Sequence, residues 1–156
     1  PVDLFNKVMA VNVTGTFLCA QRAGRSMVKA GYGRIVNVAS VSAVRAGIGR
    51  TAYGTSKAAM VGLTKQLSME LGPHGITANA IAPGPVVTPM TEASYTAETV
   101  EAYTSMIPAR RLGALDDMTA TILFLLSDGA AYINGAYLPV DGGYLASGVG
   151  KTGTLK

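Results

Sequence analysis

Three stretches of the chain repeat apolar residues at intervals of three or four, the spacing that predicts a helix. They cover residues 3–31, 52–71 and 116–126. Asp3 is the expected N-cap of the first stretch. That stretch is apolar on more than one face, so we expect it to be covered on two sides, by a sheet and by a further layer or subunit.

Short runs rich in β-branched and small apolar residues alternate with these helices. They lie at 34–39, 76–82 and 137–140, and they suit strands that are buried on both faces. Such alternation implies an α/β fold with a parallel sheet and right-handed crossovers. Three strands alone leave the first strand with an unpaired apolar edge, which indicates part of a larger sheet.

The remaining segments are less regular. Residues 86–111 mix Thr, Ser, Ala, Met and Pro, and we interpret them as a mobile flap with a short helix at 97–103. Residues 1–145 are expected to form one domain, since 156 residues suit a single core. Residues 146–156, rich in Gly, Ser, Thr and Lys, are expected to form a flexible tail.

Composition narrows the possible functions. Hydrophobic residues make up 49% of the chain and charged residues 14%, which excludes intrinsic disorder. The net charge of +4 comes from scattered basic residues and Trp is absent, so we expect no nucleic-acid partner. The longest apolar stretch, residues 8–20, contains polar residues and is shorter than the ~20 residues that span a bilayer, so we expect no membrane partner.

Cysteine and histidine are scarce. The single cysteine, Cys19, has apolar neighbours in the first helix, and we expect a buried thiol in a reducing compartment, the cytoplasm. The single histidine, His74, cannot form a metal site without a carboxylate cluster, and the sequence offers no close one. We therefore expect no metal.

Tyr53 and Lys57 are the strongest candidates for chemistry. They are four residues apart near the start of a helix, so their side chains share one face. A phenol ionises near pH ~10 in water and is a poor base at neutral pH unless a nearby cation favours the phenolate. Lys57 can supply that cation, although a solvated helix face would explain the pair equally well if it stood alone.

Ser40 strengthens the functional interpretation. It follows the predicted strand at 34–39, and open α/β sheets bind ligands at the carboxyl ends of their strands. A hydroxyl there could donate a hydrogen bond to a substrate oxygen while Tyr53 exchanges a proton with the same oxygen. Ser42 is the competing candidate, and either serine could simply cap the loop.

Five segments carry a specific combination of residues. They read V-N-V-T-G-T-F at 11–17, G-R-I-V-N-V-A-S at 33–40, Y-G-T-S-K at 53–57, N-A-I-A-P-G-P-V-V-T at 79–88 and V-D-G-G at 140–143. Together they resemble the short-chain dehydrogenase/reductase family in its Tyr-x-x-x-Lys form. The resemblance implies the C-terminal part of a doubly wound, Rossmann-like parallel sheet, with the N-terminal nucleotide-binding half absent from this chain. In the family, the glycine-rich phosphate loop is expected to precede the segment that matches Asp3.

The resemblance also implies four catalytic residues. Tyr53 is the acid/base, Lys57 lowers the pKa of Tyr53 and contacts the nicotinamide ribose, and Ser40 orients the substrate oxygen. Asn12 holds a proton-relay water. Asn is a poor residue for the middle of an apolar helix, and a hydrogen bond to another helix is the alternative explanation for Asn12.

The implied cofactor is NAD or NADP, and the choice between them stays open. Pro83, Gly84, Val86 and Thr88 match the family's cofactor loop, together with Tyr53 and Lys57. The backbone of Val86 is expected at the nicotinamide carboxamide, and Thr88 near the nicotinamide or the phosphates.

The implied reaction moves a hydride between this cofactor and a secondary alcohol or its ketone. A sugar or polyol, a 3-oxoacyl thioester and a cyclic ketone are all compatible substrates. Ser42, Pro85 and Met90 are candidates for the substrate pocket. Arg45 and Arg50 are candidates for binding an anion, but they could equally be surface charges.

A homo-oligomer, dimer or tetramer, is also implied, because in the family the helices that match residues 5–28 and 53–71 pack across a subunit interface. One departure from the family's pattern is Asn134, where a Thr is frequent.

Two other classes of function compete. One is a non-catalytic assembly or binding module built on the apolar helices. The other is a serine acyl-enzyme of the penicillin-recognising type, because Ser26 and Lys29 match S-x-x-K and residues 151–153 match K-T-G. No S-D-N triplet lies between these motifs, so we interpret that match as chance.

Overall fold

The three predicted strands form one parallel sheet. In the structure, a computed structural model that describes residues 1–148, the strands are β1 (Gly33–Val38), β2 (Ile76–Pro83) and β3 (Tyr137–Val140). They lie in the order β1-β2-β3, so β2 is central. The residues of β2 are buried from the first to the seventh, which explains why its sequence shows no apolar–polar alternation.

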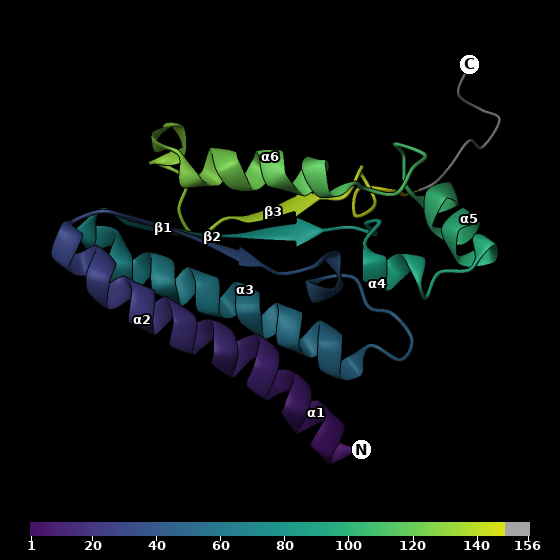
Figure 1. Cartoon of the computed structure of the whole chain (residues 1–156), viewed down its shortest axis with the longest axis horizontal. Helices are drawn as coiled ribbons and strands as arrows, with labels where there is room; N and C mark the ends of the chain where they lie inside the picture. The colour runs from purple at the N-terminus through teal and green to yellow at the C-terminus, as the bar shows by residue number, and fades with distance from the viewer. Residues whose placement is uncertain (149–156) are drawn as a thin grey trace.

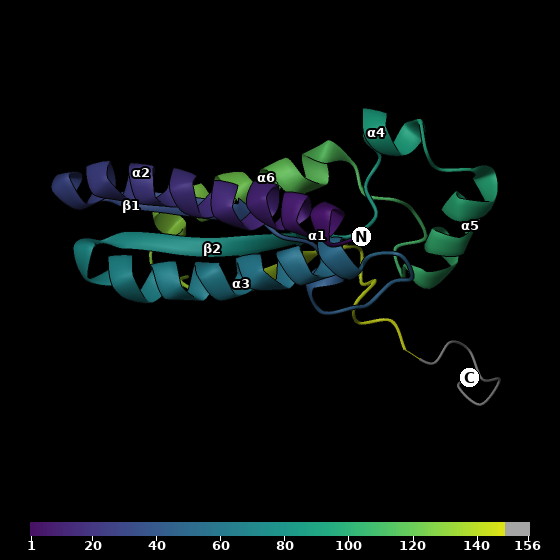
Figure 2. The same ribbon diagram turned by 90° about the horizontal axis from the view of Figure 1, so that it is seen from below.

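Helices cover both faces of the sheet, as a doubly wound fold requires. α2 (Gly15–Ala30) and α3 (Thr51–Leu71) lie side by side on one face, and α6 (Leu115–Leu126) lies on the other (Figures 1 and 2). The α/β class and the Rossmann-like architecture are therefore confirmed. Two alanines of β2, Ala78 and Ala80, leave room for the helices on the α3 side.

The first predicted helix changes its hydrogen-bond pattern part-way along its length. α1 (Val2–Met9) continues into a π-helical turn, η1 (Ala10–Thr14), and then into α2. The residues at both junctions keep right-handed helical torsions, so the path of the helix is continuous. The expectation that Asp3 caps the helix is wrong. The helix already begins at Val2, and Asp3 lies in its first turn, where a carboxylate still stabilises the positive helix end.

Cys19 does not have the environment that its neighbours suggested. Its thiol is free and exposed, which corrects the prediction of a buried thiol. The reason lies in the periodicity of α2, because the buried residues of this helix are Ala20 and Gly24, on the side that meets the sheet and α3. Other apolar side chains on α1, η1 and α2 are exposed as well, namely Val2, Leu4, Val11, Phe17 and Leu18.

The segment between β2 and α6 is more regular than its composition indicates. It contains α4 (Pro89–Glu92) and α5 (Ala97–Met106). Thr88 and Thr96 are the N-caps, and each side-chain oxygen accepts a hydrogen bond from the backbone amide three residues later. The predicted helix at 97–103 is confirmed and extends three residues further, whereas α4 was not predicted.

Two further differences concern helix and strand ends. α6 begins at Leu115, one residue before the predicted Asp116. Asn134 ties the sheet to a helix, because its amide oxygen accepts from the Ala78 N–H at 2.8 Å and its amide nitrogen donates to the Ser68 carbonyl at 3.2 Å. The departure from the family's Thr is thus accommodated by two hydrogen bonds that hold β2 against α3.

Most of the predicted tail at 146–156 lies outside the described residues. Within residues 1–148, Ser147 is held by Arg45, whose guanidinium donates to the serine hydroxyl at 3.4 Å. None of the helices described is both long and apolar enough to cross a bilayer.

Candidate functional site

A cleft of about 510 Å³ opens where β1 and β2 end. Its walls come from the loop after β1, the first turns of α3 and the segment around α4 and α5. The structure brings most of the predicted site residues to this cleft. Those that line it are Ser40, Ser42, Tyr53, Lys57, Pro83, Gly84, Pro85, Val86, Thr88 and Met90.

Tyr53 and Lys57 share the face of α3 that borders the cleft. The Lys57 ammonium nitrogen lies 5.6 Å from the centre of the Tyr53 ring. Its position is set by a hydrogen bond of 2.8 Å to the carbonyl of Val38, the last residue of β1. Burial lowers the pKa of Lys57 from its usual value of 10.5, because a charged ammonium is poorly solvated there.

Ser40 follows β1 and is buried. Its hydroxyl oxygen accepts the backbone N–H of Ser42 at 3.1 Å and so caps the short turn η2 (Val41–Ala43). Its carbonyl accepts the hydroxyl of Tyr137 on β3 at 3.0 Å. The Ser40 side chain therefore both caps the loop and faces the cleft, and its hydroxyl hydrogen is still available as a donor.

Asn12 does not line the cleft, but hydrogen bonds through Ser56 on α3 connect it to the backbone of Tyr53, which does. Its side-chain amide donates to the Ser56 hydroxyl at 3.0 Å, and that hydroxyl donates to the carbonyl of Tyr53 at 2.7 Å. The alternative explanation for Asn12, a hydrogen bond between helices, thus describes a contact that exists. Ser56, which is fully buried, was missed at the sequence level although it lies between Tyr53 and Lys57.

The loop after β2 is shaped by a close approach at Gly84. A Cβ atom on Gly84 would lie 2.8 Å from the Cβ of Asp141, in the turn that follows β3. The Asp141 carboxylate holds that turn by accepting the amides of Gly143 and Leu145, both at 2.9 Å. Glycine at position 84, which lines the cleft, therefore lets the loops after β2 and β3 meet.

Val86 offers a backbone group to the cleft. Its carbonyl accepts the Thr91 hydroxyl at 2.8 Å. Its amide donates to no acceptor among residues 1–148, although Val86 is buried. Because Val86 lines the cleft, an amide there without a protein acceptor can donate to a ligand carbonyl. A nicotinamide carboxamide supplies such a carbonyl, and the residues present fit this cofactor.

Aromatic side chains form the outer wall of the cleft. The rings of Tyr95 and Tyr103 lie 5.5 Å apart, and those of Tyr103 and Tyr144 lie 6.3 Å apart. Tyr103 and Tyr144 were not identified from the sequence, because they are separated from Tyr53 by 50 residues or more and no local motif contains them.

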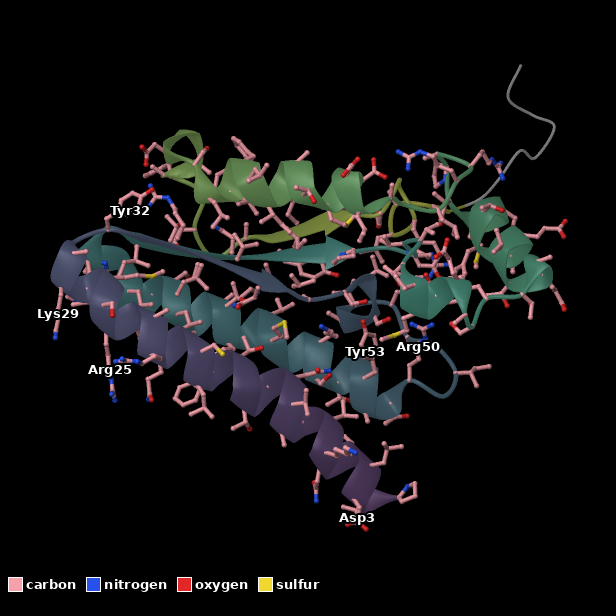
Figure 3. All side chains as sticks on the ribbon, viewed as in Figure 1. Asp3, Arg25, Lys29, Tyr32, Arg50 and Tyr53 are labelled. Atoms are coloured by element: carbon pink, nitrogen blue, oxygen red, sulfur yellow. The ribbon has the colours of Figure 1, made fainter. Side chains whose placement is uncertain are left out.

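The residues behind the acyl-enzyme alternative do not form a site. Ser26 and Lys29 are exposed on α2, and Figure 3 shows Lys29 at the end of the molecule opposite to Tyr53. The K-T-G motif at 151–153 lies outside the described residues. Within residues 1–148, no group of three or more His, Cys, Asp or Glu side chains could hold a metal ion.

Comparison with known proteins agrees with this geometry. The family model described as enoyl-(acyl carrier protein) reductase, a model of short-chain dehydrogenases/reductases, matches residues 1–145. The chain belongs to the short-chain dehydrogenase/reductase family. Members of this family in curated collections include a 3-oxoacyl-[acyl-carrier-protein] reductase of Aquifex aeolicus, 41% identical over 89% of this chain and 56% of its own.

Two further members show the range of the family. The NAD-dependent glycerol dehydrogenase of Listeria innocua is 41% identical over 92% of this chain and 57% of its own. The crystal structure of a gluconate 5-dehydrogenase of Burkholderia cenocepacia, in complex with NADP and tartrate, has a TM-score of 0.91 at 32% identity, over 95% of this chain and 58% of its own. The chain thus spans a little over half the length of these short-chain dehydrogenases/reductases.

Proposed function

We propose that this chain supplies the catalytic cleft of an NAD(P)-dependent oxidoreductase that interconverts a secondary alcohol and its ketone. The observation that carries the proposal is the meeting of Ser40, Tyr53 and Lys57 at the carboxyl ends of β1 and β2. Such strand ends are where open α/β sheets bind their ligands. The named activities of the relatives, which are dehydrogenases and reductases, support the same class of reaction.

Each residue has a role that follows from its place. The hydroxyl of Tyr53 donates a proton to the substrate oxygen during reduction and accepts one during oxidation. The Lys57 ammonium, 5.6 Å from the ring centre, stabilises negative charge on the phenol oxygen as the proton leaves. The Ser40 hydroxyl donates to the same substrate oxygen and orients it.

The cofactor end of the cleft has its own donors. A bound NAD or NADP supplies or accepts the hydride. The Val86 amide would hold the carboxamide, Lys57 would contact the ribose, and Thr88 and Pro83 would border the ring. Gly84 keeps this wall open, because a side chain at that position would collide with Asp141.

We further propose a homo-oligomer, dimer or tetramer, that acts in the cytoplasm. Apolar side chains that are exposed on α1 and α2 support association. A free thiol at Cys19 suits a reducing compartment. The relatives' named substrates are an acyl-carrier thioester, glycerol and gluconate, so they leave the substrate class open.

Replacement of the phenol hydroxyl tests the proposal. In the product of the complete gene, Tyr53→Phe should lower turnover by roughly 10²- to 10⁴-fold, the usual contribution of a positioned proton donor. NADH and NADPH oxidation would be followed with a panel of ketones. Tyr132→Phe removes the same hydroxyl from an exposed residue and should be fully active.

Two outcomes would contradict the proposal. A Tyr53→Phe protein with activity close to that of the wild type would exclude the assigned proton transfer. A wild-type protein that binds neither cofactor would favour the non-catalytic assembly module instead.

A further inference from the structure

The charges that line the cleft are of one sign. Its lining contains three cationic residues, Arg45, Arg50 and Lys57, and neither Asp nor Glu. Burial, followed by the neighbouring Tyr103, raises the pKa of Tyr95 above its usual value of 10.0, so Tyr95 stays a neutral phenol. The cleft is therefore electropositive, and a ligand that enters it meets no acidic side chain.

Two of these cations already have defined partners. Lys57 donates to the Val38 carbonyl and lies beside Tyr53. Arg45 donates to the Tyr144 carbonyl at 2.7 Å, and its guanidinium lies 4.0 Å from the centre of the Tyr144 ring. Arg45 thus fixes the turn after β3 to the cleft wall.

Arg50 is bound much less completely. One of its terminal nitrogens donates to the hydroxyl of Tyr103 at 3.1 Å, and the Tyr95 phenol also interacts with the guanidinium. No acidic side chain within residues 1–148 forms an ion pair with Arg50. A guanidinium carries five N–H donors, so most of its donor capacity remains for a ligand. The contact with Tyr103 on α5 holds the side chain toward the cleft.

Arg50 is also close to the reacting group. Its guanidinium carbon lies 6.0 Å from the centre of the Tyr53 ring, and Figure 3 shows both residues at the end of α3 that borders the cleft. Arg50 and Tyr53 therefore line the same cleft, and a substrate that reaches Tyr53 passes close to the guanidinium. Guanidinium groups bind carboxylates and phosphates with two parallel hydrogen bonds.

We propose that Arg50 is a specificity-determining residue that binds an anionic oxygen group of the substrate, a carboxylate or a phosphate ester, so that the substrate is a hydroxy acid, an oxo acid or their phosphorylated counterpart. This inference rests on the proposed function, since it assigns the substrate class of the same cleft. It predicts that the anionic group lies a few atoms from the hydroxyl or keto carbon.

Matched pairs of ketones test this proposal in the product of the complete gene. Acetoacetate is compared with methyl acetoacetate, and hydroxyacetone phosphate with hydroxyacetone, so that each pair differs only in the anionic group. The wild type should prefer the anionic member of at least one pair. The pair that is preferred distinguishes a carboxylate from a phosphate.

Variants of Arg50 then separate substrate binding from catalysis. Arg50→Gln should lower kcat/KM for the anionic ketone by roughly 10- to 100-fold, mainly through KM, because a charge-assisted hydrogen bond is lost. The neutral partner and the KM for the cofactor should change less than about twofold. Arg50→Lys should recover part of the loss. Arg110→Gln, which removes the same charge from an exposed residue that does not line the cleft, is the matched control and should behave like the wild type.

The outcomes separate the two proposals. Two results overturn the assignment of Arg50. One is a preference of the wild type for the neutral member of every pair, and the other is an equal loss of kcat/KM on both members in Arg50→Gln. In either case, turnover that is lost in Tyr53→Phe leaves the proposed function intact. If Arg50→Gln raises only the KM for the cofactor, Arg50 binds the cofactor, and the assignment of Arg50 to the substrate is overturned. Failure of the wild type to reduce any ketone overturns the proposed function and this inference with it.

Discussion

Lys57 shows how a single residue can oppose stability while it supports the proposed function. Its ammonium is drawn into the cleft by the Val38 carbonyl, where burial lowers its pKa. Between that lowered value and 10.5, the folded protein binds fewer protons at this site than the unfolded chain does. The free energy of unfolding therefore rises with pH across this window, and the cost of the buried charge is fully present below it.

The variant Lys57→Met should reveal this cost. The free energy of unfolding of the variant minus that of the wild type should be largest at neutral pH. This difference should decline as the pH approaches 10.5, because the wild type loses the cost of the buried charge there. Urea denaturation of the complete gene product at several pH values measures the difference, and turnover should be lost in the same variant. Lys65→Met, at an exposed site of α3, is the matched control. If the difference in free energy of unfolding between Lys57→Met and the wild type does not change with pH, burial does not lower the pKa of Lys57.

At the scale of elements, the hydrogen bond from Asn12 to Ser56 connects the π turn η1 with the start of α3. π turns inside helices are rare and occur frequently at functional sites. Asn12 lies inside the turn, and Ser56 passes its hydrogen bond on to the Tyr53 carbonyl. The same contact can position α3, or it can keep Asn12 in place for a proton-relay water. The two roles predict different losses of turnover when Asn12 or Ser56 is replaced.

Single and double variants distinguish these roles. Asn12→Ala and Ser56→Ala should each lower the free energy of unfolding by about 1 kcal/mol, and the double variant should lower it by less than their sum, because one hydrogen bond is shared. Turnover should fall more in Asn12→Ala than in Ser56→Ala if Asn12 also holds the water. Denaturation and steady-state kinetics measure the two effects. Equal losses of turnover would assign Asn12 to the positioning of α3 alone.

The sequence predicted the regular elements well, and the reason is their length and their buried faces. The central strand β2 and the long helix α3 agree with prediction to within one residue at each end. The π turn could not be predicted, because its apolar spacing fits an α-helix equally well. The short helix α4 was missed, although Thr88 and Pro89 are a good helix start.

The candidate site was predictable only where its residues share a motif. Tyr53 and Lys57 lie on one helix, and Ser40 follows a strand, so local spacing indicated their common location. The contact between Arg50 and Tyr103 joins residues 53 positions apart, and only the fold brings them together. The prediction of a buried thiol at Cys19 was wrong for a related reason, since the sequence does not show which apolar side of a helix meets the sheet.

At the scale of the whole molecule, the apolar residues that remain exposed are unevenly distributed. Leu18 on α2 is 55% exposed and Phe17 is 42% exposed, whereas Ala20 and Gly24 of the same helix are buried against the sheet and α3. An apolar helix face of this kind is stable when a second surface covers it. A second copy of the protein is the cover that we propose.

A charge placed on this face should weaken self-association. Leu18→Glu in the complete gene product should shift the sedimentation coefficient toward that of the monomer, because an ionised carboxylate is costly to bury in an interface. Circular dichroism should remain unchanged. Ser105→Glu adds the same charge to an exposed residue of α5 and should leave the assembly intact. An unchanged coefficient for Leu18→Glu would exclude this face as the interface.

The π turn has one more consequence, for the length of the chain. An α-helix rotates by about 100° per residue, so the loss of one residue from α1 or α2 would turn every side chain beyond that point away from its neighbour. A π turn contains one residue more than an α turn along nearly the same path. The loss of one residue from Ala10–Thr14 would instead return the turn to α geometry and keep α1 against α3 and α2 against β1. Asn12 thus lies where this helix can tolerate a change in residue number, whereas its flanks depend on their register.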